Sequence, residues 1–125
     1  MTGVSKATIR KSVLRNYGFC RVAVSSPEVK VANVDFNCQE IEAVIDSAST
    51  AGVDVIVFPE LCITGYSCGD LFYQQTLLEH ARRALVRLAS KTKASSQAVI
   101  VGLPLLEQGK IFNCAACIVG GEILG

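Results

Sequence analysis

The stretch VIVFPELCITGYSCGDLF, residues 55–72, passes from an apolar run to a polar, glycine-bearing loop that opens with a carboxylate. Its beginning, together with Val53 and Asp54, forms the short and nearly unbroken apolar run VDVIVF, which is typical of a central strand covered on both faces. Pro59 ends that strand and Glu60 follows directly. Because crevices in α/β sheets form at the carboxyl ends of strands, we expect Glu60 to line a binding site.

Position alone leaves two interpretations of Glu60 open. A carboxylate held at a strand end and partly desolvated can serve as a general base. The alternative is a structural carboxylate that accepts hydrogen bonds from loop N–H groups or forms a salt bridge.

A helix is predicted over residues 36–52, because apolar side chains recur at i, i+3, i+4 and i+7 (Ile41, Val44, Ile45 and Ala48). We expect Asn37 to cap its first turn, with Glu40 three residues later in the position of a capping box. Gly52 can adopt the left-handed conformation that ends a helix.

The rest of the chain alternates in the same way between strands and a helix. Strands are predicted at residues 19–26, 98–106 and 111–119, the last entering a Gly-Gly turn with a return strand after it. Residues 74–92 predict a second helix whose buried face is Leu78, Ala81, Leu85, Leu88 and Ala89, with Arg82, Arg83 and Arg87 turned mainly to solvent. The order β-α-β-α-β-β predicts an α/β domain, a mixed sheet with helices on one face.

Composition narrows the functional class. The chain has 125 residues, 50% apolar and 18% charged, with a net charge of +1, which suits one domain. Residues 1–18 form a basic N-terminal arm without acidic residues, for which a transit peptide is the alternative, and residues 19–125 form the domain. The sequence lacks the cluster of Lys and Arg that would indicate nucleic-acid binding. No apolar run reaches the ~18 residues of a membrane span. We therefore expect a cytoplasmic protein.

The six cysteines are expected to be reduced thiols, since most lie in apolar segments where cysteine packs as a small hydrophobe. Cys114 and Cys117 have the spacing of a metal or redox pair. However, His80 is the only histidine, and on a strand residues i and i+3 point to opposite faces. We expect no metal site. Nor does a Gly-rich phosphate-binding motif follow the first strand, which argues against a nucleotide-binding domain.

The segment VFPELCITGY, residues 57–66, resembles the first catalytic motif of the nitrilase, or carbon-nitrogen hydrolase, superfamily. Residues 17–37 (YGFCRVAVSSPEVKVANVDFN), 65–81 (GYSCGDLFYQQTLLEHA), 99–105 (VIVGLPL) and 111–125 (IFNCAACIVGGEILG) are similar to one branch. That branch is the N-terminal glutaminase domain of glutamine-dependent NAD synthetases.

The resemblance implies part of an α-β-β-α sandwich with a Glu-Lys-Cys triad. In that family the cysteine attacks the side-chain amide of glutamine, the glutamate is the general base and the lysine stabilises the oxyanion. The ammonia passes to a separate synthetase domain, which uses ATP and Mg²⁺ to amidate nicotinic acid adenine dinucleotide. Glu60 matches the base, and Tyr66 matches an aromatic residue near the substrate pocket, although Tyr66 packing against a neighbouring strand is equally compatible.

The other two triad members have no counterpart in these 125 residues. Lys110 precedes the IFN segment, whereas the family's lysine follows it, and Cys62 takes a position without a catalytic role. The synthetase domain is also absent, so no cofactor is expected here. We predict an expressed fragment or truncated gene model of a full-length enzyme, which is inactive alone and self-associates through an apolar sheet face without its partner layer. A split or degenerate protein that pairs with another chain is an alternative. The alternatives are another carbon-nitrogen hydrolase, such as an amidase or carbamoylase, and a non-catalytic assembly module.

Overall fold

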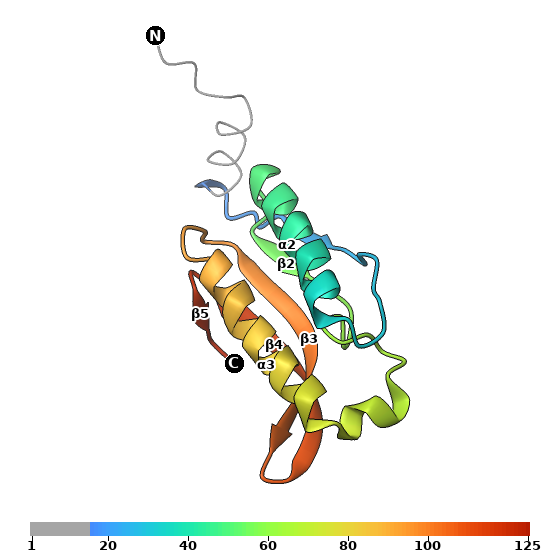
Figure 1. The fold of residues 1–125 in the computed structure, drawn as a ribbon. Helices are drawn as coiled ribbons and strands as arrows, with labels where there is room; N and C mark the ends of the chain where they lie inside the picture. The colour runs from blue at the N-terminus through green and yellow to red at the C-terminus, as the bar shows by residue number, and fades with distance from the viewer. Residues whose placement is uncertain (1–15) are drawn as a thin grey trace.

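The computed structural model describes residues 16–125 (Figure 1). Most of the predicted basic arm therefore lies outside the described residues. In chain order the elements are β1 (Val22–Val24), α2 (Val34–Thr50), β2 (Val55–Val57), the 3₁₀ helix η1 (Gly69–Tyr73), α3 (Gln75–Lys91), β3 (Ala98–Glu107), β4 (Lys110–Val119) and β5 (Glu122–Ile123). The predicted order of strands and helices is confirmed, although β1 is shorter than expected.

The five strands form one mixed sheet in the order β1-β2-β3-β4-β5. The first three strands run parallel, joined by the crossover helices α2 and α3, and β4 and β5 are antiparallel additions. β3 and β4 pair over ten residues each, from Ala98 opposite Val119 to Glu107 opposite Lys110. This long hairpin fixes the relative height of residues on the two strands.

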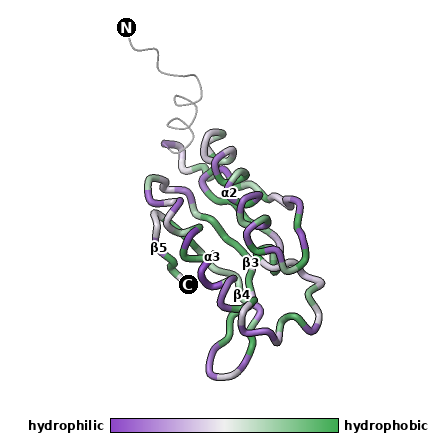
Figure 2. The backbone as a smooth tube through the Cα atoms, in the orientation of Figure 1, coloured by the Kyte–Doolittle hydropathy of each residue, from purple (hydrophilic) through white to green (hydrophobic). Residues whose placement is uncertain are grey.

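Both helices cover the same face of the sheet (Figure 1). The core lies between the helices and the sheet. On the strands, Ile56, Val99, Val101 and Ile118 are almost completely buried. Figure 2 shows that β3 is hydrophobic along most of its length, whereas α3 alternates between hydrophobic and hydrophilic residues. On the opposite face Val22 is 60% exposed and Val24 82% exposed. The predicted mixed sheet with helices on one face is confirmed. On β1, no described layer covers Val22 and Val24.

The start of α2 differs from the prediction. The helix begins at Val34, and Asn33 is the cap, with its side chain accepting a hydrogen bond from the Phe36 N–H at 3.1 Å. Asn37 lies inside the helix and is completely buried. The predicted cap at Asn37 is wrong because its side chain makes tertiary bonds instead: it accepts from the Lys30 N–H at 2.7 Å and donates to the Lys30 and Ile63 carbonyls at 3.0 Å.

The end of α2 and the faces of α3 follow the prediction. Gly52 has a positive φ of 76°, the left-handed conformation that glycine adopts most readily. The five apolar residues predicted for the buried face of α3 are all buried, and Arg82, Arg83 and Arg87 are all exposed. Arg87 also contacts α2, with its guanidinium 3.2 Å from the Asp35 carboxylate and 3.5 Å from Glu42. Among the helices of residues 16–125, none is long and apolar enough to cross a membrane.

Candidate active site

Glu60 lies where the chain leaves the sheet and turns back. Pairing with β3 continues for one residue beyond β2, since the Phe58 N–H donates to the Ile100 carbonyl at 2.9 Å. The chain then turns through Leu61, whose φ of 51° lies in the left-handed region that few non-glycine residues occupy. The Cys62 N–H donates to the Pro59 carbonyl at 3.3 Å, which closes a turn with Glu60 and Leu61 at its centre. Glu60 is therefore held at the apex of a tight, hydrogen-bonded turn.

Gly102 on β3 provides the surface on which this turn rests. A Cβ at Gly102 would lie 2.5 Å from the Leu61 nitrogen, 2.7 Å from the Pro59 oxygen and 2.9 Å from the Glu60 Cα. Real Cβ atoms do not approach other atoms so closely, so the turn can pack here only against glycine. The Gly102 carbonyl also accepts from the Ile63 N–H at 3.2 Å. β3 thus fixes the backbone of Glu60.

The Glu60 carboxylate forms a hydrogen bond with a residue of β4. Asn113 of β4 donates a hydrogen bond from Nδ2 to Oε1 of Glu60. Both side chains are exposed, so the partial desolvation expected for Glu60 is not seen. The reason is its place at the rim of the sheet, where no described residue covers it. No local sequence pattern points to Asn113, because only the strand register brings it beside Glu60.

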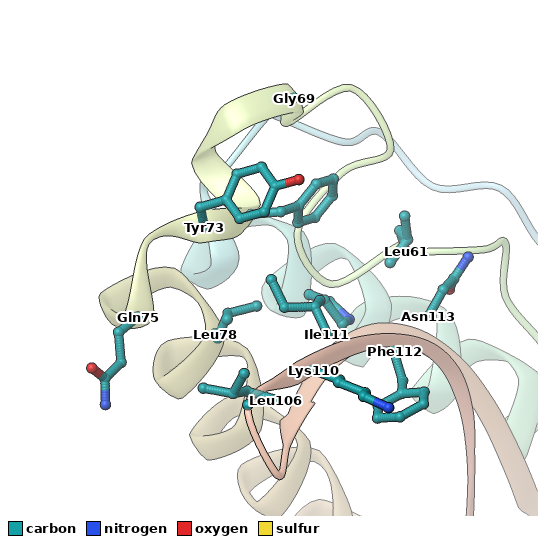
Figure 3. A pocket seen from close by; sticks show the side chains of 13 residues that line it. Leu61, Gly69, Tyr73, Gln75, Leu78, Leu106, Lys110, Ile111, Phe112 and Asn113 are labelled. Carbon is teal, nitrogen blue, oxygen red and sulfur yellow. The ribbon is translucent and has the colours of Figure 1, made fainter.

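A groove of about 930 Å³ has Asn113 in its lining (Figure 3). Leu61, which follows Glu60, and Asn113, which binds it, both line the groove. Glu60 itself is not among the lining residues, so the expectation that it lines the binding site is not met. Most other lining residues are apolar or aromatic and come from η1, α3 and the β3–β4 hairpin: Phe72, Tyr73, Leu78, Pro104, Leu106, Ile111 and Phe112. Lys110 is the one cationic residue among them. Apolar walls with a few polar groups are typical of a small-molecule site.

Tyr66 does not line this groove. Its side chain is 69% exposed, so the alternative that it packs against a neighbouring strand is not seen either. The aromatic residues in the groove come from farther along the chain, as Tyr73 and Phe72 in η1 and Phe112 in β4. A role for Tyr66 in substrate binding stays a prediction.

Cys62 is close to Glu60 in sequence but is built into the core. It is 2% exposed, and burial raises the pKa of its thiol to about 11. Its sulfur accepts from the Gly102 N–H at 3.4 Å and donates to the Gly102 carbonyl at 3.6 Å. A nucleophilic cysteine must be a thiolate, and a thiol with this pKa is protonated at neutral pH. Cys62 therefore serves to pack the turn.

The remaining thiols and the lysine do not complete a triad within the described part of the chain. All six cysteines are free thiols, and Cys114 and Cys117 are partly exposed on β4. Lys110 lies at the tip of the hairpin, opposite Glu107 in register. Over residues 16–125, no three His, Cys, Asp or Glu side chains lie close enough together to hold a metal ion.

The family model for carbon-nitrogen hydrolases matches residues 21–125. This chain belongs to the carbon-nitrogen hydrolase family. A curated relative, the glutamine-dependent NAD(+) synthetase of Mycobacterium tuberculosis, is 30% identical over 109 residues, which are 87% of this chain and 16% of that protein. The resemblance found from the motifs is thus confirmed.

Solved structures agree with the family assignment. The crystal structure of a glutamine-dependent NAD(+) synthetase from Cytophaga hutchinsonii matches with a TM-score of 0.80 and 29% identity, over 85% of this chain and 18% of that one. An amidase from Nesterenkonia sp. matches with a TM-score of 0.69 and 21% identity, over 85% of this chain and 41% of that one, which shows the fold alone. This carbon-nitrogen hydrolase chain therefore has part of the nitrilase fold, and it spans under a fifth of the synthetases it matches.

Proposed function

We propose that the chain carries the general base, Glu60, of a glutaminase site that releases ammonia from the side-chain amide of glutamine for NAD synthesis. The observation that carries the proposal is the bond between Asn113 and Glu60 at the edge of the groove. The bond holds the Glu60 carboxylate next to two residues that line the groove, Leu61 and Asn113. The turn that carries Glu60 is also the segment that contains the family motif. The likeness to NAD synthetases supports glutamine as the substrate.

The chemistry follows from the position of the base. Glu60 takes the proton of a cysteine thiol, and the thiolate attacks the side-chain carbonyl carbon of glutamine. The proton then passes from Glu60 to the leaving nitrogen, so that ammonia departs and a thioester remains. Glu60 next takes a proton from water, whose oxygen attacks the thioester, and the proton returns to the thiolate as glutamate leaves. A lysine cation stabilises the oxyanion in both steps.

The proposal assigns the cysteine and lysine roles to no described residue. The candidates close in sequence are unsuited, because Cys62 is a buried thiol with a raised pKa and Lys110 precedes the IFN segment that the family's lysine follows. We therefore expect the 125-residue chain alone to release no ammonia from glutamine. ATP and Mg²⁺ belong to the amidation step, which the proposal places in a separate synthetase domain.

Substrate choice separates this proposal from its alternatives. The polypeptide encoded by the complete reading frame is incubated with glutamine, short aliphatic amides and N-carbamoyl amino acids, and ammonia release is measured. We expect glutamine to be turned over fastest. A preference for aliphatic amides or carbamoyl compounds supports another carbon-nitrogen hydrolase, and no release from any of them supports a non-catalytic module; either result contradicts the proposal.

A further inference from the structure

The Glu60 side chain needs an anchor if it is to act as a base. It is exposed, and a free glutamate side chain loses rotamer freedom when it is fixed in one position. A general base must nevertheless stay within hydrogen-bond reach of the proton it removes. We propose that Asn113 is a positioning residue that orients the Glu60 carboxylate toward the nucleophile, an inference that rests on the proposed function.

The hairpin places Asn113 at a fixed position relative to the backbone of Glu60. Gly102, on which the turn rests, pairs with Ala115, and Pro104 pairs with Asn113. Since residues two apart on a strand point to the same face, Asn113 and Gly102 lie on one face of the hairpin, one register step apart. The ten-residue ladder between β3 and β4 holds this spacing. The same hairpin thus fixes both ends of Glu60, its backbone and its carboxylate.

The chemistry of the contact suits a base. The amide Nδ2 is a neutral donor, and its bond takes up Oε1 of the carboxylate without adding a charge beside Glu60. Because only Oε1 is occupied by this bond, Oε2 can receive the proton. An aspartate at position 113 would have the same shape but would place a second negative charge beside Glu60.

Burial does not explain the contact. Asn113 is exposed, and water can satisfy an exposed amide at little cost. The fold therefore does not need the bond to Glu60. This distinguishes Asn113 from Asn37, whose buried amide must find partners inside the protein.

The test compares two substitutions in the polypeptide encoded by the complete reading frame, Asn113→Ala and Asn113→Asp. We expect Asn113→Ala to lower kcat for glutamine hydrolysis by about 100-fold, the loss typical of a base displaced by about 1 Å, with KM for glutamine changed less than threefold. Asn113→Asp should lose at least as much. Gln39→Ala, which removes an exposed amide from α2, is the matched control and should leave kcat and the melting temperature unchanged.

Three outcomes separate the inference from the proposal on which it rests. If Glu60→Gln retains hydrolysis, or the wild type shows none, the proposed function fails. If Glu60→Gln is inactive while Asn113→Ala keeps the wild-type kcat, only the positioning role is overturned. A normal kcat in Asn113→Asp together with a loss in Asn113→Ala would show that the residue only fills space, and this also overturns the inference.

Discussion

Substitution of Gly102 by alanine tests directly whether β3 fixes the position of Glu60. The added methyl group would lie 2.5 Å from the Leu61 nitrogen and 2.9 Å from the Glu60 Cα, where ordinary contacts begin at 3.4 Å. These are backbone atoms, so rotation of a side chain cannot relieve the overlap. The turn must move away from β3 by roughly 1 Å, a small-to-large change in a well-packed site.

Two quantities should change together. Overpacking of this kind costs about 1–3 kcal/mol in the free energy of unfolding. A base displaced by about 1 Å costs about 100-fold in the rate of glutamine hydrolysis. Urea unfolding measures the first on the 125-residue chain, and steady-state ammonia release measures the second on the polypeptide encoded by the complete reading frame.

Gly125→Ala is the matched control, since a Cβ at Gly125 meets no atom within 4 Å. It should change neither quantity. A Gly102→Ala variant with the stability and rate of the wild type would refute the reasoning, because the turn would then be free to move without consequence. A loss of stability without a loss of rate would show that β3 supports the fold but does not locate the base.

Three further predictions concern packing and assembly. Asn37→Ala should lower the free energy of unfolding by about 2–4 kcal/mol in urea denaturation, because it leaves buried backbone groups unpaired; a loss below about 1 kcal/mol would contradict this. Cys62, whose thiol has a pKa of about 11, should resist alkylation by iodoacetamide at pH 8 in the native chain, whereas the exposed Cys20 should react. Mass spectrometry measures the labelling of each cysteine, and equal labelling of the two would contradict this prediction. The 125-residue chain should self-associate in analytical ultracentrifugation and Val24→Lys should weaken this, while a wild-type monomer at micromolar concentration would exclude it.

Local patterns in the sequence were sufficient for the sheet and the helix faces. The apolar run ending at Phe58 and the spacing of Leu78, Ala81 and Leu85 report burial, which depends mainly on periodicity. The predicted cap of α2 is wrong because Asn33 and Asn37, four residues apart, have the same side chain and hence the same capping chemistry. What separates them is the contact of Asn37 with Ile63, a tertiary bond that no local pattern contains.

For the same reason, the sequence predicts only one of the residues that form the candidate site. Glu60 stands out because a charge follows directly after a buried strand, and the family motif supports it. Asn113 looks like any polar residue on an exposed strand, and its meaning depends on the register of β4 against β3. Gly102 resembles any strand glycine until the turn carrying Glu60 is seen resting on it.

The central claim, that Glu60 is the base of a glutaminase site, is tested most directly by comparing two nitrogen donors. NAD formation from nicotinic acid adenine dinucleotide is measured with glutamine and with ammonium for the wild type and Glu60→Gln, in the polypeptide encoded by the complete reading frame. Glu28→Gln, an exposed carboxylate away from the groove, is the control. We predict that Glu60→Gln loses glutamine-driven turnover and keeps ammonium-driven turnover at the wild-type rate. Retained glutamine-driven turnover, or equal loss of both, would contradict the assignment.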